Sequence, residues 1–164
     1  LDRIESIAIG ATQHAANRVI DAYPWSEDSS RFSLKYLIPY ALIHGAPGID
    51  AFSDDAIDDD AVRALSHCVI AAVDDEFANV SVSGLSPSRV TIIFDNGDRL
   101  EHVVRIASGS KETAMSEAAI KQKFHACATR AVSESAASDL YDTLRNLRHQ
   151  SDLRDLWPLL TIDE

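Results

Sequence analysis

Short runs of apolar residues in the first two thirds of the chain predict β-strands. Residues 4–9 carry three isoleucines and stop at Gly10, as a strand does. Residues 67–73 predict another strand. Residues 12–22 have no decisive period, and residues 23–28 read as a polar loop that precedes a helix.

A hairpin around Asn96-Gly97 is the clearest local signal in the sequence. A two-residue turn there would mix apolar and charged residues on one face. A three-residue loop over 95–97, with Gly97 left-handed, instead pairs Phe94 with Asp98 and Ile92 with Leu100. We therefore predict the three-residue loop. One face of the hairpin then carries Val90, Ile92, Phe94, Leu100, Val104 and Ile106.

Helical spacing of apolar residues begins after Ser33, which is placed as an N-cap, and continues until Gly45. Pro39 lies inside this helix, where it removes a backbone donor and is expected to introduce a kink. The acidic residues 58–60 stand where an N-cap and a first helical turn belong. Their spacing does not fit a calcium-binding loop, so we interpret them as a helix start.

After Gly109 the apolar spacing becomes helical, and it predicts one helix capped by Ser116 and a second helix that follows Ser133. Residues 153–160 are too apolar for a free tail and are expected to dock on another surface. The sequence thus predicts an α+β fold, in which helices pack on a small antiparallel sheet and C-terminal helices follow. The apolar positions of the two helices are Ile120, Phe124, Cys127 and Ala131, and then Leu140, Leu144 and Leu147.

Composition narrows the class of protein. A hydrophobic fraction of 46% and a charged fraction of 25% are those of a globular chain. The net charge of −11 argues against nucleic acid as a partner, although a few local cations can still hold a small anion. No apolar run approaches the ~20 residues of a membrane helix, so no membrane partner is expected. Because the chain begins at Leu1 with no initiator Met, we expect it to derive from a longer product.

The two cysteines, Cys68 and Cys127, lack CxxC spacing and sit in apolar contexts. We expect both to be buried thiols in a reducing compartment, which for this chain means the cytoplasm. The six histidines never fall at metal-ligand spacing, so no metal is expected. No glycine-rich phosphate loop, HExxH or GxSxG motif is present.

The block over residues 31–36 is the best candidate for chemistry. Arg31, Ser33, Lys35 and Tyr36 bring two cations, a hydroxyl and a phenol within one turn of a helix start. Such a helix start suits a carboxylate ligand, because backbone donors and fixed charge converge there. The alternative is a capped amphipathic helix whose Arg31 and Lys35 are simply solvated.

This block, together with residues 40–45, resembles the (K/R)FS-x-x-Y…A-x-L-x-x-G pattern of the MmgE/PrpD family, which includes 2-methylcitrate dehydratases and cis-aconitate decarboxylases. Other blocks follow in the family's order. Residues 4–7 are similar to its I-x-x-I strand and residues 91–97 to its hairpin. Residues 108–124 are similar to a segment that runs from a glycine through a serine to Lys-Phe.

The resemblance implies that residues 1–118 form an α+β lid domain. Residues 119–164 would then be C-terminal helices that pack on an all-helical domain preceding this chain. It also implies acid–base chemistry on a small di- or tricarboxylate, without metal or organic cofactor, in a homodimer. Most of the acid–base residues would lie in the preceding domain. Tyr36 would supply a catalytic phenol, and Arg31, Ser33 and Lys35 would bind the substrate.

Two positions depart from the family pattern, and both leave the substrate undetermined. Pro39 stands where family helices carry small residues, and His44 stands where an acidic residue is common. A lid of a dehydratase, decarboxylase or isomerase is thus one hypothesis. A free-standing, non-catalytic α+β binding or regulatory module is the second, and a family member that has lost activity is the third.

Overall fold

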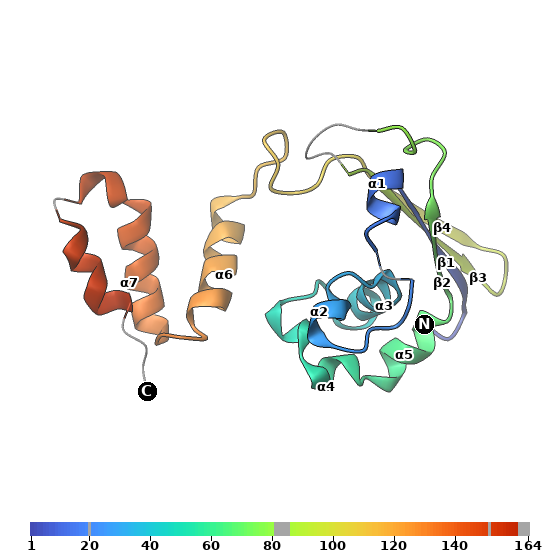
Figure 1. Ribbon diagram of the computed structural model, residues 1–164, viewed down its shortest axis with the longest axis horizontal. Coiled ribbons are helices and arrows are strands. Elements are labelled where there is room, and N and C mark those ends of the chain that lie inside the picture. The colour runs from blue at the N-terminus through green and yellow to red at the C-terminus, as the bar shows by residue number, and fades with distance from the viewer. Residues whose placement is uncertain (20, 81–85, 151, 161–164) are drawn as a thin grey trace. The chain divides into compact units, whose positions relative to one another are not determined.

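The chain forms an α+β unit followed by a helical unit (Figure 1). The computed structural model describes residues 1–19, 21–80, 86–150 and 152–160. The compact units are Leu1–Thr113 and Ala114–Glu164. The domain boundary expected after residue 118 falls in the first turn of α6. The strands are β1 (Ile4–Ala11), β2 (Val69–Val73), β3 (Ser88–Phe94) and β4 (Arg99–Val104). The helices of the first unit are α1 (Gln13–Ala16), α2 (Glu27–Ser30), α3 (Leu34–His44), η1 (Ile49–Phe52), α4 (Asp54–Ile57) and α5 (Asp60–Ser66).

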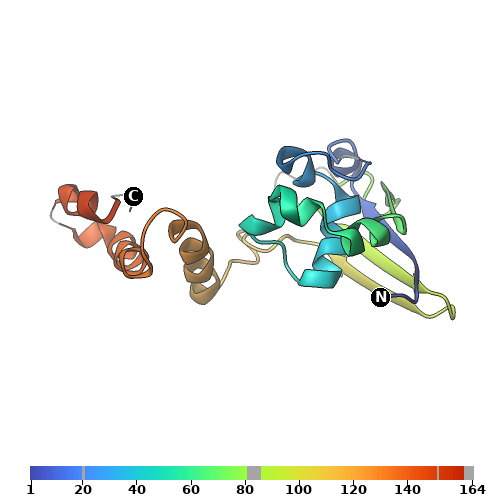
Figure 2. The same ribbon diagram turned by 90° about the horizontal axis from the view of Figure 1, so that it is seen from below.

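The four strands form one sheet in the order β2-β1-β3-β4. The predicted α+β class is confirmed, but the sheet is mixed, because β1 and β2 run parallel while the other two pairs are antiparallel. A parallel pair needs a long crossover, and helices α1 to α5 supply it. These helices gather on one face of the sheet (Figure 2).

The hairpin has the predicted three-residue loop. The Phe94 amide donates to the Asp98 carbonyl at 3.0 Å, and Ile92 pairs with Leu100. Gly97 has φ 83°, the left-handed conformation that the loop requires. Val90 and Ile92 pack against the core, whereas Leu100 on the edge strand is 60% exposed. The predicted register is therefore confirmed. On the apolar face of the hairpin, the β3 residues pack against the core, whereas Leu100 on β4 stays exposed.

Helix α3 is apolar on two sides because it lies between two clusters. Leu34 and Ile38 pack on the sheet cluster of Ile7, Ile9 and Val69. A second cluster joins α3 to α4 and α5, through Tyr36, Ile57 and Val62 with Tyr23, Leu37, Tyr40 and Ile43. A helix with apolar residues on most of its surface is expected to be buried in this way.

The ends of the helices follow the sequence closely. Gly45 ends α3 with φ 88°, and the helix continues without interruption through Pro39. Asp59 is the N-cap of α5, and its carboxylate accepts from the amides of Ala61 and Val62. The prediction that the acidic run starts a helix is confirmed.

The opposite face of the sheet is polar and centres on Arg89. Its guanidinium lies 2.8 Å from the Asp74 carboxylate and 3.0 Å from that of Glu101, and it also pairs with Glu76. The guanidinium packs 5.3 Å from the ring centre of the buried Phe77. Through these ion pairs Arg89, on β3, links β4 to the turn that follows β2.

The second unit contains α6 (Glu117–Ala128), α7 (Glu134–Arg145), η2 (Leu147–His149) and η3 (Leu153–Leu160). Ser116 caps α6 as predicted, and α7 begins after Ser133 as predicted. Ser133 is the N-cap of α7, and the hydroxyl of each serine accepts from the amide three residues further along the chain. Leu140 is buried, and η3 packs against α7, while Trp157 is 69% exposed.

The prediction that both cysteines are buried is wrong for Cys127. Cys68 is half-buried beside β1, but Cys127 is exposed. No described residue of α6 is buried, so this exposure of Cys127 is typical of its helix. Both thiols are free.

Candidate functional site

The four predicted site residues lie at the junction of α2 and α3. Arg31 follows the last residue of α2, and Ser33 precedes the first residue of α3. Helix α2 is only one turn long, and Ser26 and Ser29 form a capping box at its start. Three residues, 31–33, separate the end of α2 from the start of α3.

Two of the four side chains are buried and turned away from solvent. The Ser33 hydroxyl, fully buried, donates to the Ala22 carbonyl at 2.6 Å. Ser33 occupies the N-cap position of α3 as predicted, but its hydroxyl makes no cap hydrogen bond to the helix. The hydroxyl instead links the start of α3 to the loop that precedes α2.

Tyr36 is also fully buried, and its hydroxyl donates to the carbonyl of Ala51 in η1. A phenol has a single proton to donate, so this bond uses it. Burial, with the neighbouring Tyr40 and Tyr23, raises the pKa of Tyr36 to about 12. In this arrangement the phenol is a neutral donor that fastens η1 to α3.

The two cations remain at the surface. The Lys35 ammonium lies 3.2 Å from the carboxylate of Asp21. The Arg31 guanidinium lies 3.7 Å from the carboxylate of Asp28, and its centre is 5.9 Å from the centre of the Phe52 ring. Exposed pairs of this kind contribute only ~0–1 kcal/mol, so both cations can exchange partners readily.

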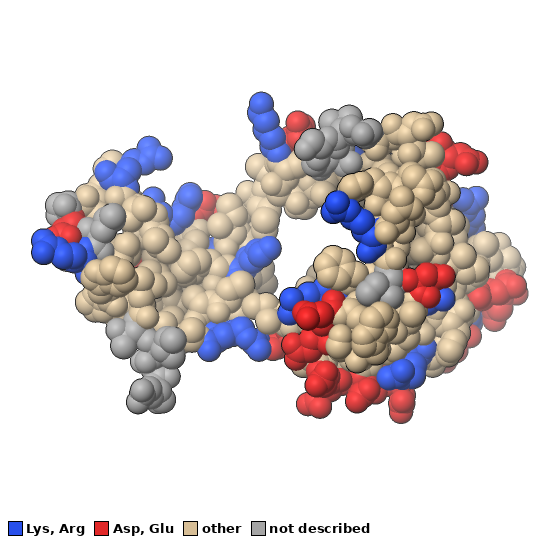
Figure 3. Space-filling view, viewed as in Figure 1, with Lys and Arg blue, Asp and Glu red and all other residues tan. Residues whose placement is uncertain are grey.

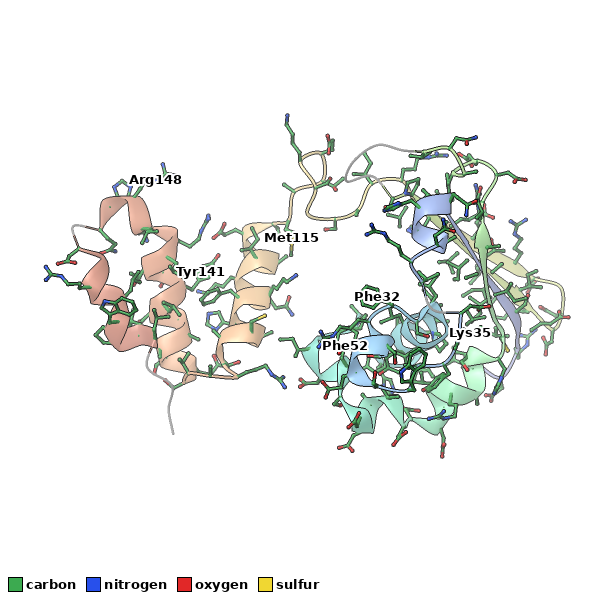
Figure 4. All side chains as sticks on the ribbon, in the orientation of Figure 1. Phe32, Lys35, Phe52, Met115, Tyr141 and Arg148 are labelled. Atoms are coloured by element: carbon green, nitrogen blue, oxygen red, sulfur yellow. The ribbon has the colours of Figure 1, made fainter. Side chains whose placement is uncertain are left out.

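A hollow of about 300 Å³ opens beside the start of α3. Of the four predicted residues, only Arg31 lines it. Two further basic side chains share the hollow, and apolar side chains supply most of the remaining wall. The residues that matter here are His14, Arg18 and Arg31, with Phe32, Leu34 and Leu37. Phe32 lies on the side of the helices away from the sheet (Figure 4).

Acidic and basic side chains of the α+β unit gather in different places on the face shown in Figure 3. Acidic side chains gather over α4 and its neighbours, whereas basic side chains lie next to α1 (Figure 3). The acidic edge includes Asp54, Asp55 and Asp58. The hollow thus concentrates positive charge in a chain whose net charge is −11. An anion is the ligand that such a local potential favours.

The comparisons with known proteins agree with the resemblance. The family model of the MmgE/PrpD C-terminal domain matches residues 1–149 of the 164. The chain belongs to the MmgE/PrpD family. The match includes β1 to β4 and α1 to α7; it spans the first unit and reaches into the second, and η3 lies outside it. No curated protein matches it.

Within the described residues, no three His, Cys, Asp or Glu side chains are grouped so that they could hold a metal ion. No described helix is long and apolar enough to cross a membrane. Sequence reasoning missed His14 and Arg18, which come from the segment that had no clear period. Only the folded chain brings them beside Arg31.

Proposed function

We propose that this MmgE/PrpD chain is the C-terminal lid-and-tail portion of a lyase or isomerase. The enzyme acts on a small di- or tricarboxylate by acid–base chemistry, without metal or organic cofactor. The residues that carry most of the acid–base chemistry would lie in an all-helical domain outside this chain. By itself the chain would then bind part of the substrate but would not turn it over.

Family membership over residues 1–149 is the observation that carries this proposal. The local chemistry supports it, because cationic side chains at the surface around α2 and α3 suit carboxylate groups. The family resemblance supplies the reaction class. Removal of a proton next to a carboxylate requires a positioned base and a pocket shielded from water, and a lid provides the shielding.

The proposed roles of the four residues differ in what they require. Arg31 is exposed and Lys35 is half-buried, and each need only exchange a weak partner to reach a substrate carboxylate. Ser33 would act from its buried position by fixing the backbone before α3. Tyr36 would serve as a proton or hydrogen-bond donor only after its hydroxyl leaves the Ala51 carbonyl.

The test is an activity assay of the intact protein, expressed from its complete reading frame. Dehydration of 2-methylcitrate or citrate forms a conjugated double bond, which absorbs in the near ultraviolet. We expect turnover on at least one tricarboxylate, and we expect it to persist after treatment with a chelator. The proposal is wrong if the intact protein turns over no di- or tricarboxylate, or if chelation abolishes the activity.

Tyr36→Phe in the intact protein tests the catalytic role of the phenol. We expect kcat to fall strongly, measured well below the unfolding temperature so that folding does not limit the rate. A folded variant with unchanged kcat and KM would remove Tyr36 from the catalytic site and leave it as an anchor of η1.

A further inference from the structure

We propose that the hollow lined by His14, Arg18 and Arg31 binds a small polycarboxylate, with one carboxylate on each arginine. The proposal rests on the proposed function for its choice of carboxylate as the anion. It goes further by assigning a ligand role to Arg18 and His14, which the family comparison does not assign.

The guanidinium of Arg18 has no partner among the described residues. No hydrogen bond or ion pair joins its guanidinium to any described residue of the chain. Arg148 is likewise exposed and unpaired within the described residues, but Arg18 differs from it in lining the hollow. Arg89 shows the contrast, since three carboxylates surround it. The Arg18 guanidinium keeps its full donor capacity for a ligand.

Arg31 supplies the second cation, because its ion pair with Asp28 is weak and easily replaced. Its carboxylate partner, Asp28, is 3.7 Å away, and the side chain of Asp28 is 94% exposed. A ligand carboxylate that binds in two-pronged fashion is a better partner than a single exposed contact at that distance. Arg31 lines the hollow, and its guanidinium also lies 5.9 Å from the centre of the Phe52 ring.

The position of Arg18 is fixed by the fold. Thr12 is almost fully buried at the end of β1, and its hydroxyl caps α1 by accepting from the Ala15 amide at 3.1 Å. The Arg18 amide in turn donates to the Ala15 carbonyl at 2.9 Å. The sheet therefore holds α1, and α1 holds the backbone that carries His14 and Arg18.

The size and lining of the hollow indicate the class of ligand. A volume of about 300 Å³ is at the small end of the ~300–1,000 Å³ range of ligand pockets. Leu34, Leu37 and Phe32 give it an apolar wall. A short hydrocarbon backbone bearing two or three carboxylates matches both the wall and the cations, and His14 adds a hydrogen bond donor or acceptor.

The test is a titration of the full chain with citrate and with tricarballylate. Binding is measured by isothermal titration calorimetry and by the NMR chemical shifts of the backbone amides. We expect saturable binding of both acids, with shifts at the amides around residues 14–18 and 31–37. Arg18→Gln and Arg31→Gln should each weaken binding about tenfold or more, the scale of one charge-assisted contact. Arg148→Gln, an exposed arginine of the other unit, should leave binding unchanged.

Three results would overturn the inference. These are absence of saturable binding, equal binding by wild type and both hollow variants, and tighter binding of inorganic phosphate than of citrate. None of these results bears on turnover by the intact protein. A catalytically active intact protein whose citrate affinity ignores Arg18 would refute this site and leave the proposed function standing.

Discussion

The hydrogen bond from Tyr36 to Ala51 gives the sharpest prediction about the fold around the site. Tyr36→Phe keeps the ring and its contacts with Tyr23 and Tyr40, whose centroids lie 5.9 and 5.6 Å away. It removes only the hydroxyl. Because Ala51 is 1% exposed, its carbonyl then has no solvent to replace the lost donor.

The cost follows from that burial. A buried carbonyl left without a donor costs about 1–3 kcal/mol. For a unit of this size, a loss of about 2 kcal/mol lowers Tm by roughly 8 °C. The buried ring leaves no cavity, so the change in the free energy of unfolding reports the hydrogen bond and not packing.

Urea unfolding of the full chain, followed by circular dichroism, measures this change. Tyr40→Phe is the matched control, because Tyr40 lies one turn further along α3 and no described residue hydrogen-bonds its hydroxyl. We expect Tyr36→Phe to lose about 2 kcal/mol and Tyr40→Phe to lose little. Equal stabilities for Tyr36→Phe and the wild type would refute the reasoning that this bond fastens η1 to α3.

Three further predictions concern other parts of the α+β unit. Gly10→Ala places a Cβ 2.6 Å from an oxygen of Asp74 and should destabilise the chain by about 1–3 kcal/mol in urea unfolding. Gly97→Ala, at φ 83°, should cost about 1 kcal/mol by the same measurement. Hydrogen bonds to the Asp59 carboxylate, first from the Val62 amide and then from His44, lower the pKa of Asp59. The Asp59 carboxylate therefore stabilises the fold above the ordinary pKa of Asp, and this stabilisation is lost as the pH falls through the pKa of Asp59 in the folded chain. Asp59→Asn should therefore flatten the fall in Tm below about pH 4.

Each of these predictions has a control or a contrary outcome. Gly48→Ala has open space around the added Cβ and should leave the stability unchanged. A Gly97→Ala variant as stable as the wild type would contradict the left-handed loop. An Asp59→Asn variant with an unaltered pH profile of Tm would mean that this carboxylate does not contribute to the acid limb.

Local signals predicted the fold well wherever the chain's own neighbours decide the structure. The register of the hairpin followed from the requirement that Ile92 face an apolar partner, and the helix starts at Asp59, Ser116 and Ser133 followed from capping chemistry. The parallel pairing of β1 with β2 was not predictable in this way. It depends on how the helices between β1 and β2 return the chain to the sheet.

The candidate site was only partly predictable for the same reason. The sequence places Arg31, Ser33 and Tyr36 within one turn of the helix start, but spacing alone does not say which side chain faces solvent. In the structure, the Ser33 hydroxyl donates to the Ala22 carbonyl and the Tyr36 hydroxyl donates to the Ala51 carbonyl, so neither faces solvent. Arg18 lies in a segment without a clear period, and only tertiary packing brings it beside Arg31.

The most direct test of the account is turnover of tricarboxylates by the intact protein, with and without a chelator. The account predicts that at least one of 2-methylcitrate, citrate and cis-aconitate is converted, at a rate that the chelator does not change. Arg31→Gln should raise KM for that acid. A folded intact protein that converts none of these acids would contradict the central claim.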